Sequence, residues 1–373
     1  MHENYNRATP IGVPRPPGER IFRTDSACPV HPAPSISDAM NGVRARRLTH
    51  PIHPTGSAMS TPSRPFDHPL PAGAWPVALT PFGPDRELDL SAYRDLLRRY
   101  ADAGSAGVFA TCLSSEIADL TANEIVILSR FAVSELEGRI PVVSGAVADL
   151  PLAGLIDLVR RVYDTGPAAV VLAAGTLCPG DADDTAWRRA CEKLMDATPG
   201  IPLGIYECPW PNHRRLPVDT MAWLADSGRF HFHKDTVCNA AAVRAKAAAV
   251  AGSPLRFYDA HLPTLFDSMQ AGGAGFSGVA GNFCPALLAH ACTLYADGRR
   301  DPEIDALLEE LGRLIPPGYP ANAKAFLGDT RGWKIGLTCR AVAETDRDNL
   351  AALASLAERV EATLGRRTAA SAS

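Results

Sequence analysis

A lysine and a tyrosine, Lys234 and Tyr206, each stand at the far end of a short apolar run. The runs cover residues 201–209 and 229–236, and both are typical of strands buried in a parallel sheet. The two residues are 28 positions apart, close to the roughly 30 residues that one strand–helix unit of a (β/α)8 barrel uses. We therefore predict that both side chains face one pocket at the carboxyl ends of neighbouring strands.

The chemistry that such a pair could perform is Schiff-base formation. An ordinary lysine has a pKa near 10.4, so only about one amine in two thousand is uncharged at pH 7. Burial penalises the ammonium form, and a pKa of about 7 corresponds to roughly 4.6 kcal/mol of desolvation. An uncharged Lys234 could attack a carbonyl carbon, and the Tyr206 phenol could move protons as the adduct forms and breaks. For either residue alone, a solvated lysine or a core tyrosine is an equal alternative.

Composition favours small-molecule chemistry. The chain has 373 residues, 46% hydrophobic and 21% charged, with a formal net charge of -4 and a pI of about 6.2. This balance predicts no nucleic-acid or membrane partner, and no apolar stretch approaches the roughly 18 residues that span a bilayer. The nine cysteines show neither a C-x-x-C pair nor zinc-like spacing. We therefore expect a cytoplasmic protein, without a metal or a cofactor.

The chain divides into three parts. Residues 1–70 are rich in proline and show no periodicity, which predicts a disordered tail; translation from Met59 is an alternative interpretation. Residues 71–298 alternate apolar runs with amphipathic stretches, the pattern of a (β/α)8 TIM barrel. Residues 299–373 predict a helical C-terminal appendage, which we expect to pack against the barrel.

Eight apolar runs are the candidate barrel strands. They are Trp75–Phe82, Gly107–Cys112, Pro141–Val147, Ala168–Ala174, Pro202–Cys208, Phe230–Thr236, Arg256–Ala260 and Gly275–Asn282. Side chains alternate along a strand, so Tyr206 and Lys234 should point into the barrel and Asp235 away from it. The G-x-G-x-x-G sequence from Gly273 to Gly278 follows a helix and enters a strand, which is the wrong context for a dinucleotide site. These glycines instead leave room at the barrel mouth.

Four segments together resemble the dihydrodipicolinate synthase and N-acetylneuraminate lyase family of class I aldolases. They are Val77-Ala-Leu-Thr-Pro-Phe82, Tyr206-Glu-Cys-Pro209, Lys234-Asp-Thr236 and Gly278-Val-Ala-Gly-Asn282. The resemblance implies a Schiff base between Lys234 and pyruvate or another 2-oxo acid, with Tyr206 relaying protons. It also implies a homo-oligomer, either a dimer or a tetramer.

The same resemblance suggests substrate-binding residues. The family's Gly-Thr-Thr-Gly-Glu loop, which holds the 2-oxo acid carboxylate, aligns with residues 112–116 through Glu116. Ser114 and Ser115 are therefore expected to bind substrate, together with Thr80 and Gly278 from the other matched segments. Ordinary loop polarity is the alternative interpretation of the two serines.

Two departures from the family pattern argue against 4-hydroxy-tetrahydrodipicolinate synthase activity itself. Residues 176–180 lack the tyrosine pair of the synthases, and Pro211 stands where the synthases carry a substrate-binding arginine. Arg214 or Arg215 could replace that arginine, and His261 is a spare acid or base near the rim. The sequence thus favours a diverged lyase, aldolase or dehydratase. The synthase proper and a catalytically silent, metabolite-binding barrel remain alternatives.

Overall fold

The computed structural model describes residues 69–315, 318–340, 347 and 349–371. The predicted disordered tail therefore lies outside the described residues as far as position 68. Its last residue, Leu70, is fully buried, and its carbonyl oxygen accepts a hydrogen bond from Arg256 Nε at 3.2 Å. The ordered domain thus begins before residue 71.

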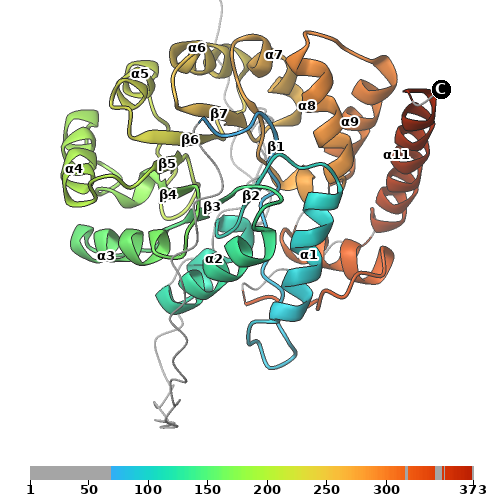
Figure 1. The fold of residues 1–373 in the computed structure, drawn as a ribbon, viewed down its shortest axis with the longest axis horizontal. Helices are drawn as coiled ribbons and strands as arrows, with labels where there is room; N and C mark the ends of the chain where they lie inside the picture. Colours follow the sequence, from blue (N-terminus) through green and yellow to red (C-terminus); the bar gives the residue numbers. More distant parts are fainter. Residues whose placement is uncertain (1–68, 316–317, 341–346, 348, 372–373) are drawn as a thin grey trace, which may run out of the picture.

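Eight parallel strands form the sheet, in the order β1-β8-β7-β6-β5-β4-β3-β2. Their bounds are β1 Gly73–Ala74, β2 Val108–Phe109, β3 Val142–Gly145, β4 Ala169–Ala173, β5 Leu203–Tyr206, β6 Phe230–Asp235, β7 Arg256–Asp259 and β8 Gly275–Phe276. The two ends of the sheet meet, because Ala106 N donates to Ala74 O at 2.8 Å and Phe109 N donates to Pro76 O at 3.0 Å. The predicted TIM-type α/β fold is confirmed (Figure 1).

The first and last strands are shorter than their apolar runs suggested. Beyond β1 the run keeps two isolated bridges, a parallel one between Val77 and Phe109 and an antiparallel one between Phe82 and Leu88. Pro76 and Pro81 interrupt this run, and proline has no N–H group with which to continue a ladder. At the other end, the residues after β8 turn into a short 3₁₀ segment, Val279–Asn282. Both segments thereby become loops at the barrel mouth.

Helices surround the sheet, as the amphipathic stretches predict (Figure 1). Those of the barrel are α1 Leu90–Asp102, α2 Ala122–Leu136, α3 Leu152–Tyr163, α4 Asp184–Ala197, α5 Val218–Asp226, α6 Ala240–Val250, α7 Leu265–Gln270 and α8 Pro285–Ala296. Local sequence sets their starts: the expected capping box opens α2, where Glu124 N donates to Thr121 Oγ1 and Thr121 N donates to Glu124 Oε2. None of the helices in the described ranges combines the length and the apolar composition needed to cross a bilayer.

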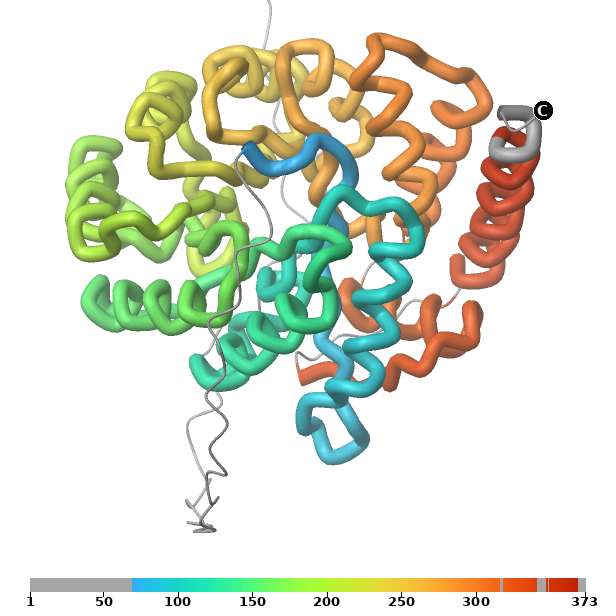
Figure 2. Tube along the Cα trace, in the orientation of Figure 1, coloured from blue at the N-terminus to red at the C-terminus, as the bar shows by residue number. Residues whose placement is uncertain are grey.

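The C-terminal part is helical but is not a separate layer on the outside of the barrel. It contains α9 Pro302–Leu314, α10 Ala321–Ala325, a π-helical turn Phe326–Thr330, and α11 Leu350–Ser371. Helix α11 packs against α9 at the side of the barrel (Figure 2). Residues 318–340, in contrast, return to the loops that follow β1 and β2. Lys324 binds the Glu116 side chain after β2, and Arg340 binds the Arg86 carbonyl after β1 and Glu124 in the first turn of α2.

Candidate active site

Tyr206 and Lys234 lie opposite each other on adjacent strands. Tyr206 is the last residue of β5, and in the parallel register its Cα pairs with that of Lys234 on β6. The Lys234 Nζ atom lies 4.4 Å from the centre of the Tyr206 ring. Only 4% of Tyr206 and 3% of Lys234 is exposed. The structure therefore brings together the two residues that the sequence selected, at the carboxyl end of the strands.

An aromatic cluster fills the barrel below this pair. Phe109 and Phe232 pack edge to face with ring centres 5.4 Å apart, and Phe232 stacks on Tyr258 at 4.7 Å. Phe109 also contacts the Tyr206 ring at 5.9 Å, and its centre lies 5.8 Å from Lys234 Nζ. The pair thus packs on apolar rings, which keep water away from that side.

The Tyr206 phenol is held in its neutral form. Burial is the main cause that raises its pKa well above the ordinary value, and the neighbouring thiols Cys208 and Cys112 add to the effect. A phenol that keeps its proton at neutral pH can donate a hydrogen bond to a developing oxyanion or supply a proton. The Tyr206 phenol could accept a proton only after giving its own proton to another group.

The loop after β2 carries the residues predicted to hold the substrate carboxylate. The Ser115 hydroxyl is 2.6 Å from the carbonyl oxygens of Ala78 and Ala110, and it accepts the Cys112 N–H at 3.1 Å. Thr80 donates to the Ser115 carbonyl at 2.8 Å. The side chains of Thr80 and Ser115 therefore join the loops after β1 and β2.

The Ser114 hydroxyl, in contrast, bonds to another side chain rather than to these loop carbonyls. It forms a hydrogen bond with the phenol of Tyr319, a residue for which the sequence suggested no role. Among the three hydroxyl residues proposed for substrate binding, Ser114 thus has the side chain best placed to exchange a partner for a ligand.

Gly278 is required for packing rather than for ligand space. A Cβ atom at this position would lie 2.5 Å from the Ala260 carbonyl oxygen and 2.6 Å from Cζ of Phe276. Its backbone is extended, with φ −143°, so the absence of a side chain is what matters. The room that the glycine leaves is filled by the protein itself.

Comparison with known proteins identifies the family. A model of the dihydrodipicolinate synthetase family matches residues 71–317. The chain belongs to this family. Among its relatives, the 4-hydroxy-tetrahydrodipicolinate synthase of Gluconacetobacter diazotrophicus is 27% identical over 274 residues, which cover 72% of this chain and 89% of the relative. A probable 5-dehydro-4-deoxyglucarate dehydratase of Streptomyces coelicolor is 44% identical over 77 residues, or 21% of this chain and 24% of the relative.

Solved structures of the dihydrodipicolinate synthetase family share the fold. YagE, a prophage protein from E. coli K12 solved in complex with pyruvate, aligns with a TM-score of 0.69 and 22% identity over 78% of this chain and 98% of its own. The dihydrodipicolinate synthase of Thermotoga maritima aligns with a TM-score of 0.70 and 19% identity over the same shares. This member of the family is therefore diverged in sequence while keeping the barrel.

The positions where this family member departs from the synthase pattern are filled by local contacts. Arg214 donates to the Ala182 carbonyl at 2.7 Å and pairs with Asp184 at 2.5 Å, so it binds the loop before α4 and the first residue of that helix. Arg215 is exposed. His261 contacts Thr264 Oγ1 at 3.2 Å, and burial lowers its pKa. The Arg214 guanidinium is thus engaged by protein groups, and His261 belongs to the turn after β7.

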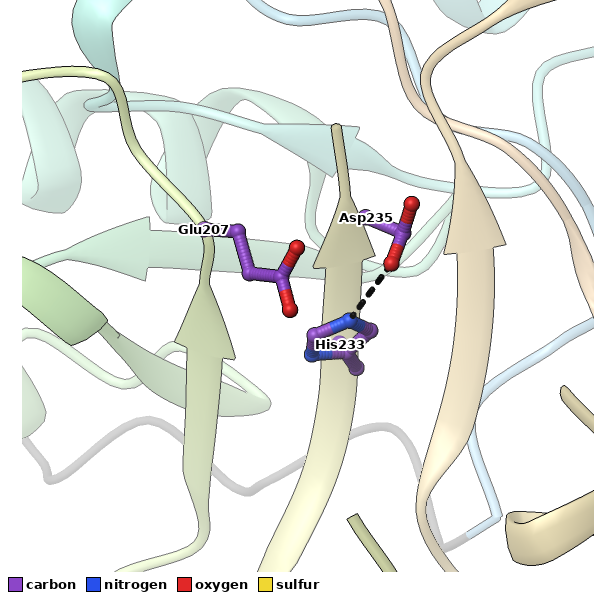
Figure 3. Close-up of side chains that lie close together, drawn as sticks. All are labelled: Glu207, His233 and Asp235. Atoms are coloured by element: carbon purple, nitrogen blue, oxygen red, sulfur yellow. Dashed lines mark ion pairs between the residues drawn. The ribbon is translucent and has the colours of Figure 1, made fainter. Parts of the chain in front are cut away.

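A second cluster lies on the outer side of the same two strands. Glu207 directly follows Tyr206 and Asp235 directly follows Lys234, so by alternation both point away from the barrel interior (Figure 3). Lys246 on α6 donates to Glu207 at 2.5 Å and to Asp235 at 2.8 Å, and all three are buried. The outward direction predicted for Asp235 is observed. The sequence pattern did not indicate Lys246, because nothing in α6 marks this alanine-flanked lysine as buried.

This outer cluster also holds the donor atoms that could bind a metal. Ligand atoms of Glu207, His233 and Asp235 lie within 4.8 Å of one another. The Lys246 ammonium, however, already supplies a positive charge to both carboxylates. The pKa of Glu207 is raised, mainly by burial and then by the nearby Asp235. Burial alone would also raise the pKa of Asp235, but His233 and Lys246 outweigh it and lower that pKa to about 2. The cluster is thus a buried ion pair that joins β5 and β6 to α6.

Proposed function

We propose that the protein is a Schiff-base-forming lyase that acts on a 2-oxo acid such as pyruvate. Its reaction is carbon–carbon or carbon–oxygen bond cleavage, or the reverse. The observation that carries this proposal is the register of β5 and β6, which sets the Lys234 amine 4.4 Å from the Tyr206 ring, with both residues buried at the carboxyl end of the strands. An amine and a phenol so placed have the two functions that imine chemistry needs.

The proposed reaction begins with attack of Lys234 Nζ on the C2 carbonyl carbon. The carbonyl oxygen takes up a proton, giving a carbinolamine, and then leaves as water as the C=N bond forms. The protonated imine draws electrons from a bond at C3. Cleavage of C3–C4 gives an enamine and releases C4 as a carbonyl compound when its hydroxyl loses a proton; loss of a C3 proton instead gives an enamine that expels a C4 hydroxyl group as water, which breaks a C–O bond. Tyr206 is the group that donates a proton to the departing oxygen and passes protons during the later steps.

Relatives support both kinds of bond cleavage. The synthase relative matches most of the chain, and the dehydratase relative matches a shorter segment at higher identity. The absence of tyrosine from residues 176–180 and the outward binding of Arg214 favour a lyase or dehydratase over the synthase proper. We keep 4-hydroxy-tetrahydrodipicolinate synthase activity as the alternative.

The test is to trap the imine. The protein is incubated with pyruvate and a panel of 2-oxo acids, reduced with borohydride, and mapped by peptide mass spectrometry. The expected result is one adduct, on Lys234, that disappears in Lys234→Arg and persists in the matched variant Lys193→Arg of helix α4. No Lys234 adduct with any 2-oxo acid would instead support a silent, metabolite-binding barrel.

Two further expectations belong to this proposal. We propose a homo-oligomer, a dimer or a tetramer, which light scattering coupled to size exclusion measures directly. We propose the cytoplasm as its compartment, and the eight free cysteines among the described residues support a reducing environment.

A further inference from the structure

We propose that the Tyr319 hydroxyl donates a hydrogen bond to the carboxylate of the substrate, next to Ser114, and so helps to select 2-oxo acids over other carbonyl compounds. This inference deepens the proposed function and depends on it for the choice of substrate. It assigns a role to a residue of the C-terminal segment, which lies outside every motif used to interpret the sequence.

Tyr319 reaches the barrel mouth from the chain that follows α9. Its phenol oxygen accepts a hydrogen bond from Asn282 Nδ2 at 2.7 Å, and Asn282 ends the 3₁₀ turn after β8. Asn282 itself is fully buried. Tyr319 is thus fixed to the carboxyl end of the barrel, the end at which barrel enzymes perform their chemistry.

The hydrogen bonds of Asn282 decide the direction of the Tyr319 proton. Asn282 Nδ2 also donates to the Val77 carbonyl at 2.8 Å, and a carbonyl can only accept. The amide nitrogen must therefore face Val77 and Tyr319, while its oxygen accepts from the Tyr100 hydroxyl. The Tyr319 oxygen consequently accepts a hydrogen bond from Asn282, and its own hydroxyl proton is left for a different acceptor.

Ser114 is a polar side chain beside this phenol. The Ser114 side chain forms a hydrogen bond with the Tyr319 phenol, and only 4% of Ser114 is exposed. The two phenols of Tyr319 and Tyr206 are also near enough for Tyr319 to contribute to the raised pKa of Tyr206. The Tyr319 hydroxyl therefore lies on the side of the mouth that holds Ser114, the serine aligned with the carboxylate-binding loop, and near the proposed proton donor.

An arriving carboxylate is a better acceptor than a serine hydroxyl. Hydrogen bonds to a charged oxygen are shorter and roughly twice as strong as those between neutral groups. Burial raises the pKa of Tyr319 far above its ordinary value, so the phenol keeps its proton and remains a donor at neutral pH. A neutral donor also avoids placing a second cation near the Lys234 amine.

The segment that carries Tyr319 is anchored at two points that follow it in the chain. Lys324 donates to Glu116 at 2.6 Å, and the Arg340 guanidinium pairs with Glu124 at 2.5 Å. Both carboxylates belong to the stretch from the end of β2 into the first turn of α2, which also holds Ser114. These contacts hold Tyr319 and Ser114 at a fixed separation, which a two-residue carboxylate contact requires.

The test compares two carbonyl compounds on one variant. Borohydride trapping on Lys234 is measured against the concentration of pyruvate and of hydroxyacetone, which lacks the acid group. In Tyr319→Phe we expect the half-saturation concentration of pyruvate to rise roughly tenfold to hundredfold, the loss of one hydrogen bond to a charged group, and that of hydroxyacetone to stay unchanged. The ratio of the two half-saturation concentrations is taken within one variant. Partial unfolding therefore lowers the amount of trapped adduct but does not change this ratio.

The control is Tyr295→Phe, which removes a phenol hydrogen bond to Asp305 at the far end of α8 and should leave both values unchanged. Equal changes for pyruvate and hydroxyacetone in Tyr319→Phe, or no change in either, would overturn the proposal. A titration of pyruvate followed by ligand-observed NMR requires no imine. Suppose that the wild type gives no adduct but that Tyr319→Phe binds pyruvate more weakly in the NMR titration: the carboxylate contact then stands, and only the Schiff-base function fails. Equal pyruvate affinity of wild type and Tyr319→Phe in that titration overturns the contact.

Discussion

Lys324 and Glu116 are separated by 208 positions in the sequence and form an ion pair of 2.6 Å in the interior, with the lysine side chain wholly buried. Lys324 also donates to the Thr338 carbonyl at 2.7 Å, and the second Glu116 oxygen accepts from Arg340 N at 2.6 Å. Glu116 has a left-handed backbone, with φ 57°, which is uncommon for a residue with a side chain. The pair thus attaches the C-terminal segment to the loop that carries Ser114.

Removing this lysine should destabilise the protein strongly. Lys324→Met leaves the Glu116 carboxylate buried without its cation, which costs about 3–5 kcal/mol. Urea unfolding would show this as a lower midpoint with an unchanged slope. Arg313→Met is the control, because Arg313 and Glu309 form an exposed pair one helical turn apart; it should change stability by less than about 0.5 kcal/mol. A Lys324→Met midpoint equal to that of the control would contradict the ion pair.

Tyr206→Phe should slow proton transfer without preventing imine formation. An enamine exchanges the C3 protons of pyruvate with solvent, so deuterium exchange followed by NMR reports on the cycle without knowledge of the second substrate. Loss of a positioned proton donor lowers such rates by roughly 10²–10⁴-fold. We expect that decrease in Tyr206→Phe, continued trapping on Lys234, and a normal rate in Tyr295→Phe. A normal exchange rate in Tyr206→Phe would remove the tyrosine from the mechanism.

The rate of the same exchange should not fall up to pH 10 through ionisation of the Tyr206 phenol. Burial raises the pKa of this phenol above the ordinary value near 10, so the protonated form is retained as the pH rises through the range in which a free phenol ionises. Exchange rates between pH 6 and pH 10 in the wild type and in Tyr206→Phe test this. A decline with a midpoint below 10 that is present only in the wild type would be the opposite result.

The outer cluster should make stability respond to pH when its cation is removed. In the wild type, Asp235 has a folded-state pKa of about 2, below its ordinary value, so its contribution is complete above about pH 4 and is lost as the pH falls through 2. Lys246→Met places two buried carboxylates together, and one of them then holds a proton in the folded state. The variant should lose about 3–5 kcal/mol at pH 8 and recover part of it at pH 5.5.

Urea unfolding of Lys246→Met at the two pH values measures this recovery. The control is Arg244→Met on the same helix, whose exposed pair with Asp267 should make little difference at either pH. A Lys246→Met protein that is no more stable at pH 5.5 than at pH 8 would show that the carboxylates do not share a proton.

A side chain at Gly278 should be costly, and one at Gly365 should not. In Gly278→Ala the new methyl group meets the Ala260 carbonyl at 2.5 Å, and such overpacking typically costs about 1–3 kcal/mol. Gly365 is an exposed residue of α11, and a methyl group there would have no neighbour within 4 Å, so Gly365→Ala should stabilise by roughly 0.5–1 kcal/mol. Thermal unfolding of both variants should shift the midpoint in opposite directions; equal shifts would refute the packing role of Gly278.

The barrel could be predicted from the sequence because each of its strands and helices has a local pattern. Apolar runs and helical periodicity gave eight strands, and alternation along β5 and β6 placed Tyr206 and Lys234 on inward positions. The capping box at Thr121 fixed the start of α2. The observed strands are shorter than the predicted runs, most of all β1, β2 and β8. Near Trp75 prolines are the reason, since proline cannot continue a ladder, whereas after β2 and β8 the chain turns into 3₁₀ segments.

The proposed carboxylate contact and both buried ion pairs could not be predicted in this way. Tyr319 and Lys324 lie in the predicted appendage, and nothing in their own neighbourhood marks them for the mouth. Their partners, Asn282 and Glu116, are brought to them only when the chain closes the barrel and then returns across it. Local patterns depend on neighbours in sequence, whereas these contacts depend on where distant segments meet, which only the packing of the complete barrel determines.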